Sequence, residues 1–150
     1  MAIVLLLTCL SLNLYLTGIT WFLQLIHFPL FESVGTNQFH DYHRKFFQKK
    51  QFLVLIPTIL ATLAAFILLW IQPWGTNMVF VKINLGMILA AQAATVILVE
   101  PIHKVLSSHG YSDKAIRHLT RVNWIPTFAW TGSSSMIILA VFNILLRHNG

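Results

Sequence analysis

The sequence predicts an all-α membrane protein: an antiparallel four-transmembrane-helix bundle with short interfacial helices in the two cytoplasmic loops. Of its 150 residues, 57% are hydrophobic and only 9% are charged, whereas a soluble domain carries about a quarter charged residues. The charges are also clustered, because four stretches contain no Asp, Glu, Lys or Arg: 1–31, 51–81, 83–99 and 122–146. Crossing a bilayer takes about 20 apolar residues. We therefore expect about four crossings in a single domain, 1–150.

The four spans are bounded by prolines, turn residues and charges. We expect them at 3–28, 52–71, 78–99 and 124–146. Pro29 follows the first span and Pro101 the third, and helices commonly end near proline. The segment 72–77, with its Pro-Trp-Gly sequence, predicts a tight turn between the second and third spans.

Two polar segments between the spans have helical character. In 36–50, Thr36 can cap a helix, and in 112–122, Ser112 can do the same. The second segment carries an apolar stripe at helical spacing, formed by Ala115, Ile116, Leu119 and Val122. We expect both segments to lie along the membrane surface as interfacial helices.

The basic residues predict the orientation in the membrane. Loops 32–50 and 100–121 together hold eight Lys and Arg, whereas the opposite side has only Lys82 and Arg147. The positive-inside rule places both loops in the cytoplasm and both termini outside. Because the charges lie between spans, the net charge of +6 indicates contact with lipid headgroups and not with nucleic acid. The single cysteine, Cys9, excludes an intrachain disulfide.

The expected cytoplasmic side also gathers six of the seven histidines and all four acidic residues. His40 and His43 are three residues apart, and so are Glu100 and His103, which is the spacing by which helix bundles hold di-iron sites. These four side chains are the candidate metal ligands, and they suit iron, copper or zinc. The alternative is that the histidines are simply solvated. We favour it, because a di-iron site needs more carboxylates than Glu32 and Glu100 supply.

A second set of polar residues lies on one face of the first span, at intervals of three and four. Its members are Asn13, Thr17, Thr20, Gln24 and His27. Polar groups in hydrocarbon need partners, so this face should look into the bundle. There it would either form hydrogen bonds between helices or line a pocket for an amphipathic quinol or phenol. We favour the first role for Asn13 and the threonines, and both roles stay open for Gln24 and His27.

Several short motifs resemble those of a known family. They are Trp21-Phe22-x-Gln24 followed by Pro29-Leu30-Phe31, then Tyr42-His43, then Pro101-x-His103-x-x-Leu106, and finally Asn123-Trp124-Ile125-x-Thr127-x-x-Trp130. Together they are similar to the anthrone oxygenase-like family of small four-helix integral membrane proteins, whose bacterial members are mostly uncharacterised. That family includes fungal enzymes that oxidise anthrones to anthraquinones with dioxygen. The resemblance points to His43, His103, Asn123 and Trp124 as site residues.

A weaker similarity is to the small haem-containing protoporphyrinogen oxidase of bacteria. The two share size, number of spans and a lysine near the start of the third span. That family places a histidine in its first span upstream of the tryptophan, whereas residues 13–20 contain none here. Haem is therefore a less favoured cofactor than iron or copper.

Two functional hypotheses follow, and whether the chain is an enzyme stays open. The first is a membrane-embedded oxidoreductase, an oxygenase acting on a hydrophobic aromatic or quinol-like substrate. His43 and His103 would act as acid and base or hold a metal, and the substrate-binding residues would be Gln24, His27, Asn123 and Trp124. The second is a non-catalytic membrane subunit, lipid-binding protein or assembly protein. A transporter ranks last, because four short spans would need a homo-oligomer to enclose a path.

Overall fold

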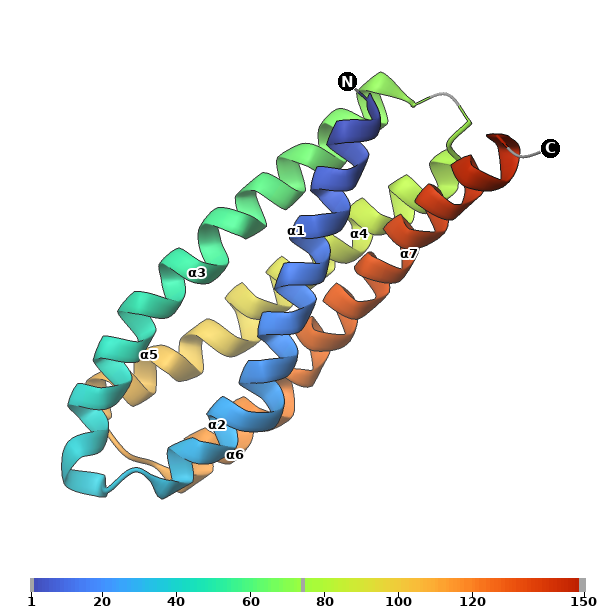
Figure 1. Ribbon diagram of the computed structural model, residues 1–150. Helices are drawn as coiled ribbons and strands as arrows, with labels where there is room; N and C mark the ends of the chain where they lie inside the picture. Colours follow the sequence, from blue (N-terminus) through green and yellow to red (C-terminus); the bar gives the residue numbers. More distant parts are fainter. Residues whose placement is uncertain (1, 74, 149–150) are drawn as a thin grey trace.

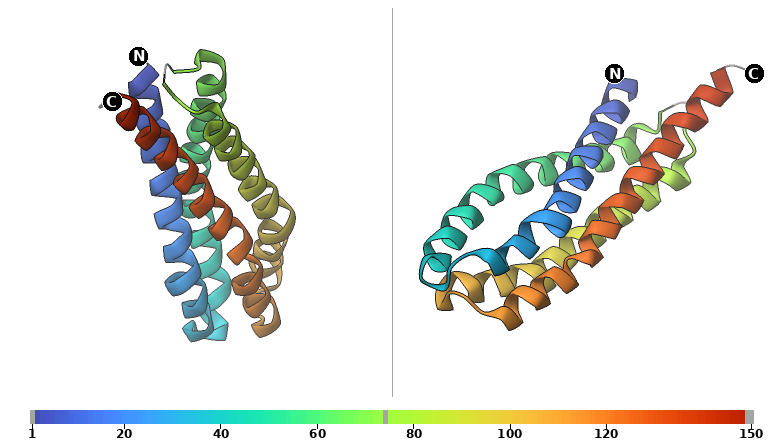
Figure 2. Two further views of the ribbon diagram at one scale, coloured as in Figure 1. Left: turned by 90° about the vertical axis from the view of Figure 1, so that its right-hand side faces the viewer. Right: turned by 60° about the horizontal axis from the view of Figure 1, so that its bottom comes forward.

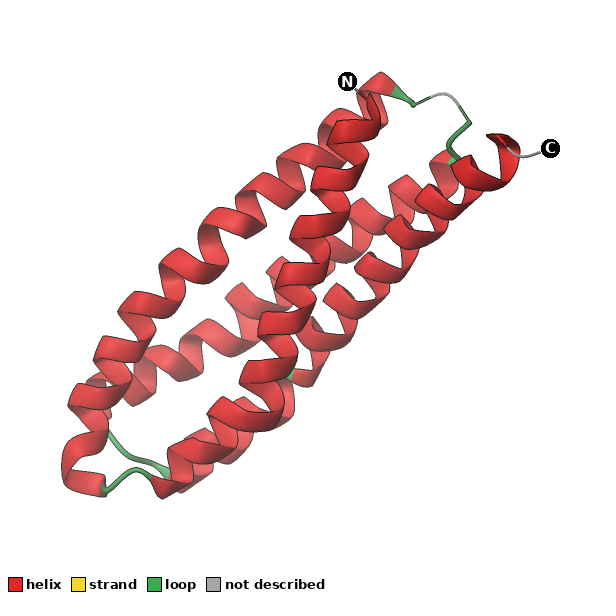
Figure 3. Cartoon of the chain, viewed as in Figure 1, coloured by secondary structure: helices red, strands yellow, loops and turns green. Residues whose placement is uncertain are grey.

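The computed structural model describes residues 2–73 and 75–148, and all regular structure in these ranges is helical (Figure 3). Four long helical rods lie side by side (Figure 1). Ala2, His148 and the helix ends at Ile71 and Met78 lie at one end of the bundle, and the two turns near residues 34 and 111 lie at the other. Four helical stretches are long and apolar enough to cross a membrane: Ala2–Ser33, Thr36–Ile71, Met78–His109 and Asp113–Leu146. The all-α fold with four such helices is therefore confirmed.

The first and third rods are each built from consecutive helical pieces. The first contains α1 (Ala2–Phe22), the π-helix η1 (Leu23–His27), α2 (Phe28–Leu30) and the 3₁₀-helix η2 (Phe31–Ser33). The third contains α4 (Met78–Ala94), the π-helix η3 (Thr95–Val99) and α5 (Glu100–His109).

A π-helix precedes the proline in both rods. A proline within a helix lacks an N–H donor, and its ring clashes with the carbonyl four residues earlier. The widened turn accommodates this, since the Phe28 N–H donates to Leu23 O and the Glu100 N–H donates to Thr95 O. The helices therefore continue past Pro29 and Pro101, and the expectation that the first and third spans end there is wrong.

The second rod is a single helix, α3 (Thr36–Ile71). The expected short helix at 36–50 is therefore not separate from the span that follows it. Its charges do not interrupt the helix because Arg44, Lys45 and Lys49 are exposed, whereas His43 and Lys50 are buried. At 36 residues, α3 is about 54 Å long, longer than the roughly 30 Å of bilayer hydrocarbon.

The fourth rod consists of α6 (Asp113–Val122) and α7 (Trp124–His148), with a break at Asn123. The Ser112 side chain caps α6 by accepting a hydrogen bond from the Ala115 N–H, as its position predicts. Ile116 and Leu119 of the expected apolar stripe are fully buried. They pack with the end of the first rod and with α5 (Figure 2).

The interior contains two hydrophobic cores, one along the middle of the bundle and one, rich in aromatic rings, at one end. In the middle, a polar network joins three helices: the Ser133 hydroxyl donates to Asn13 Oδ1 at 2.9 Å, and Asn84 Nδ2 contacts Ser133 O at 3.0 Å. Thr20 and Gln24 are buried as well, so the inward polar face predicted for the first span is confirmed. At the end that holds the 34–35 and 110–112 turns, Phe28, Phe31 and Phe39 form a second core.

Candidate functional site

Two histidines from different helices meet inside the aromatic end of the bundle. His43 of α3 and His103 of α5 are both fully buried. His43 Nε2 lies 3.0 Å from His103 Nδ1, and His43 Nδ1 lies 3.0 Å from the Ser107 hydroxyl. The three side chains form one hydrogen-bonded chain, and the structure thus brings together both histidines predicted as catalytic.

Phenylalanine rings surround this pair. Phe39 and Phe47 stack on the His43 ring, with centroids 5.6 and 6.2 Å away. Phe28 lies edge-on to His103 at 5.5 Å. His27, half-buried on the first rod, belongs to the same aromatic cluster, because its ring lies 4.0 Å from that of Phe46. The rings exclude water and lower the local dielectric, so hydrogen bonds here are strong and unpaired polar atoms are costly.

One nitrogen of the pair has no partner. Among the residues that the structure describes, His103 Nε2 is buried without a hydrogen bond, and so is His27 Nε2. The His43–His103 bond needs one N–H and one lone pair. If His103 Nδ1 donates, His43 Nδ1 donates to Ser107, and His103 Nε2 carries a free lone pair. If Ser107 donates instead, His103 Nε2 carries the N–H. The two states differ by protons shifted along the chain, so His103 Nε2 can act as either base or acid.

A buried ion pair lies next to the histidines. Lys50 Nζ is 3.6 Å from Glu100 Oε1, and the two side chains are 8% and 25% exposed. The ammonium also lies over the Phe47 ring, 5.2 Å from its centroid. The same ring lies 5.3 Å from His103. Phe47 therefore separates the ion pair from the histidine pair.

A cavity of about 300 Å³ adjoins this ion pair. It lies between α3 and the π-helix η3, with Trp130 of α7 in its wall. Leu55 and Val96 in its rim are 56% and 65% exposed, so it opens on the outside of the bundle. Its lining residues are Lys50, Gln51, Val54, Leu55, Thr58, Gln92, Thr95, Val96, Glu100 and Trp130.

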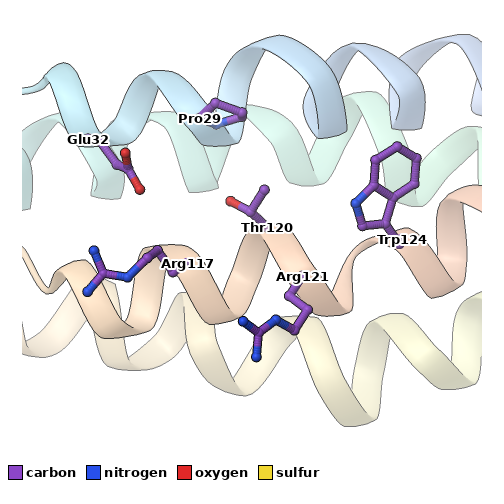
Figure 4. Close-up of a pocket in the computed structure, with 6 residues that line it drawn as sticks. All are labelled: Pro29, Glu32, Arg117, Thr120, Arg121 and Trp124. Atoms are coloured by element: carbon purple, nitrogen blue, oxygen red, sulfur yellow. The ribbon is translucent and has the colours of Figure 1, made fainter.

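A second cleft, of about 380 Å³, lies between the end of the first rod and α6 (Figure 4). Arg117, Arg121 and Thr120 line one side, and Pro29 and Glu32 line the other. Trp124 completes the cleft. Three charged side chains line this cleft, which is distinct from the cavity beside Lys50.

The four residues predicted to bind substrate are divided between three places. Asn123 Nδ2 donates to Gln24 Oε1 at 3.0 Å, and Gln24 Nε2 donates to Thr120 O at 2.9 Å, so these two amides join α6 to the first rod. His27 lies in the aromatic cluster. Trp124 lines the second cleft and packs edge-on against Trp21 with centroids 5.6 Å apart.

The four predicted metal ligands do not form one set. His43 and His103 bond to each other, Glu100 pairs with Lys50, and His40 is exposed beside Asp41 at 3.7 Å. Within residues 2–73 and 75–148, no group of three or more His, Cys, Asp or Glu side chains is arranged to hold a metal ion. Because these four donors do not converge, we assign no step to a metal.

Sequence reasoning missed Ser107 and Lys50. Both carry a signal that could have identified them. Ser107 lies four residues after His103, one helical turn along the same face, and Lys50 lies seven residues after His43, two turns along. The positive charge of Lys50 predicted only the orientation in the membrane.

Comparison with known proteins adds no family to this description. No family model matches the chain, and no curated protein or solved structure matches it. The function proposed next therefore depends on the geometry of the site and on the sequence motifs.

Proposed function

We propose that the chain is a membrane-embedded oxidoreductase of the oxygenase type, which removes a proton from a hydrophobic aromatic or quinol-like substrate. The observation that carries this proposal is the hydrogen-bonded chain Ser107–His43–His103, enclosed by aromatic rings and ending at a nitrogen without a partner. A positioned histidine contributes about 10²–10⁴-fold to a proton transfer.

In this proposal His103 is the general base and His43 a positioning residue. A proton taken up at His103 Nε2 can be compensated by transfer from Nδ1 to His43, and from His43 to Ser107. Ser107 is half-buried, so the far end of the chain is nearer to solvent than the histidines are. The charge formed in the step is thus not confined to one buried ring.

The resemblance to the anthrone oxygenase-like family supplies the overall reaction. Proton removal from a ring methylene gives an enolate that reacts with dioxygen. The methylene loses both hydrogens, one oxygen atom becomes the new carbonyl oxygen, and the other leaves as water. Gln24, Asn123 and Trp124, which belong to the motifs, would then orient the substrate, and His27 would do so from the aromatic cluster beside the histidine pair.

The membrane arrangement is part of the proposal. The chain would be an antiparallel four-helix membrane protein with loops 32–50 and 100–121 in the cytoplasm and both termini outside. The helical segments in these loops would lie at the membrane interface. The even number of spans and the eight basic residues near one end of the bundle support this orientation.

The test is oxygen consumption by the protein in proteoliposomes supplied with 1,8-dihydroxyanthrone. Empty vesicles correct for spontaneous oxidation, and absorbance identifies the anthraquinone product. We expect His103→Ala to lower the rate by about 100-fold or more, with a smaller loss for Ser107→Ala. His40→Ala and His118→Ala are matched controls, since both side chains are exposed. Full activity of His43→Ala and His103→Ala in folded protein would refute the proposal.

The alternative is a non-catalytic lipid-binding or assembly protein. The cleft in Figure 4 favours it, because two arginines among its lining residues suit the phosphate of an anionic headgroup. This alternative predicts full tolerance of histidine substitutions. It also predicts that Arg117→Gln together with Arg121→Gln reduces the anionic lipid that co-purifies with the protein.

A further inference from the structure

The cavity beside Lys50 places charged and apolar groups together on the outside of the bundle. Charged side chains within long apolar helices are costly, and they commonly mark functional sites when they persist. Lys50 is only 8% exposed, with Glu100 as its partner. The proposed function does not use this pair. A role in stability alone is poorly supported, since buried ion pairs often stabilise no better than apolar side chains of similar size.

The distance within the pair indicates what the cavity recognises. Lys50 Nζ and Glu100 Oε1 are 3.6 Å apart, beyond the roughly 2.7–3.2 Å of a good N–H···O bond. The ammonium offers three donors, and the carboxylate offers only acceptors. A hydroxyl group satisfies both, because its proton can be donated to Glu100 while its oxygen accepts from Lys50.

The remaining walls suit a flat apolar ring. Val54, Leu55, Val96 and Trp130 supply the apolar surface, and the volume of about 300 Å³ is at the lower end of the range for small-molecule sites. Thr95 and Val96 belong to the π-helix η3, and π-helical turns are frequent at functional sites. The opening lies at Leu55 and Val96, two exposed apolar side chains that would face lipid in a membrane-spanning bundle.

We propose that this cavity binds a hydroxylated aromatic molecule entering from the bilayer, with its hydroxyl group held between Lys50 and Glu100. The inference deepens the proposed function and rests on it only for the reaction that follows binding. Phe47 contacts both the Lys50 ammonium and the His103 ring. A ligand held by Lys50 is thus one aromatic side chain away from the base.

The experiment measures binding, not turnover. The probe is 2-hydroxyanthraquinone, which is already fully oxidised, and unsubstituted anthraquinone is the comparison ligand. Both are titrated into wild-type protein in lipid nanodiscs, with empty nanodiscs as the partition control. We expect the protein to bind the hydroxylated probe at least about tenfold more tightly, as the loss of one charge-assisted hydrogen bond implies.

Three variants locate the site. Lys50→Met should abolish the preference for the hydroxyl group, whereas Lys49→Met, an exposed neighbour on the same helix, should retain it. Because Lys50→Met leaves Glu100 without its partner, Val96→Trp is the second variant. It fills the rim without touching the ion pair, and it should weaken both ligands at least about tenfold.

Equal wild-type affinity for the two ligands would overturn the proposal, since it would identify a nonspecific apolar groove. Wild-type binding by both Lys50→Met and Val96→Trp would overturn it as well. The proposed function is tested separately. Loss of probe binding in Val96→Trp, with activity insensitive to His103→Ala, would retain the binding site and refute the oxygenase. Unchanged probe binding in Val96→Trp, with activity lost in His103→Ala, would retain the oxygenase and refute this site.

Discussion

At the scale of single residues, the histidine pair differs from ordinary buried histidines because a single proton lies between His43 Nε2 and His103 Nδ1. The 3.0 Å contact joins Nε2 of His43 to Nδ1 of His103, and protonating both rings would set two N–H donors against each other. The folded pair therefore resists taking up two protons. In the unfolded chain each histidine takes up a proton near its ordinary value of about 6.5.

This difference predicts that stability falls as the medium is acidified. Below about pH 6.5 the unfolded state binds more protons than the folded pair, so the free energy of unfolding decreases as pH falls. The expected slope is up to about 1.4 kcal/mol per pH unit for each proton excluded. Thermal unfolding in detergent between about pH 7.5 and 5.5 measures it.

The matched control is His40→Ala, which removes an exposed histidine and should leave the slope unchanged. The double variant His43→Phe with His103→Leu replaces both hydrogen-bonding partners by apolar groups of similar size, which preserves packing. It should remain folded with a shallower slope. A double variant with the full wild-type slope would show that other groups cause the acid sensitivity.

At the scale of elements, the close contact between α4 and α7 depends on Gly132. A Cβ added to this glycine would collide with the Met87 side chain, whose Sδ and Cε atoms occupy that space. The Met87 side chain is flexible, so Gly132→Ala should cost little, but Gly132→Leu should lower the free energy of unfolding by about 1–3 kcal/mol. Unfolding in detergent measures this, and Met87→Ala should recover part of the loss.

Gly18 supplies the comparison for this prediction. No atom lies within 4 Å of a Cβ built on it, and alanine is favoured over glycine in a helix by up to about 1 kcal/mol. Gly18→Ala should therefore be neutral or stabilising. Wild-type stability of Gly132→Leu would mean that the two helices are not held at this spacing.

The sequence predicts the elements well where one periodicity dominates. Asn13, Thr20 and Gln24 lie inside the bundle as expected, because buried polar groups recur at helical spacing whatever their partners are. The predicted helix boundaries are wrong where a proline or a run of charges is taken to end a helix, as at Pro29 and Pro101. Arg44 and Lys49 do not end α3, since both point outward from a helix longer than the bilayer is thick.

Contacts between distant segments are harder to predict from the sequence. The motifs indicated His43 and His103 separately, but their direct bond depends on how α3 and α5 pack, which no local pattern specifies. Lys50 shows the same limit: its position two turns after His43 places it on the same helix face, but no local pattern pairs it with Glu100. Pairings that cross 50 or more residues arise from packing, and a single sequence shows only periodicity.

At the scale of the whole molecule, the site lies at one end of the bundle, so the orientation in the membrane decides which compartment it adjoins. His43 and Lys50 lie in the part of α3 that follows the 34–35 turn, and His103 and Glu100 lie in α5, which leads to the 110–112 turn (Figure 1). The Arg117–Arg121 cleft lies between α6 and the end of the first rod (Figure 4). The positive-inside rule predicts that the end with these two turns faces the cytoplasm, which is a part of the proposal and needs its own test.

Cysteine accessibility tests this orientation, because the chain has one cysteine and it is buried. In a Cys9→Ser background, Lys114→Cys places a thiol on the exposed surface of α6, and a cysteine appended after Gly150 reports on the opposite end. A membrane-impermeant maleimide should label Lys114→Cys in inside-out vesicles and the appended cysteine in right-side-out vesicles. Reversed labelling would place the histidine end outside the cell, where eight basic residues would contradict the rule that predicts the topology. Labelling of both positions from the same side would contradict the bundle itself, since α6 and the C-terminal end of α7 lie at opposite ends of a helical stretch long enough to cross the membrane.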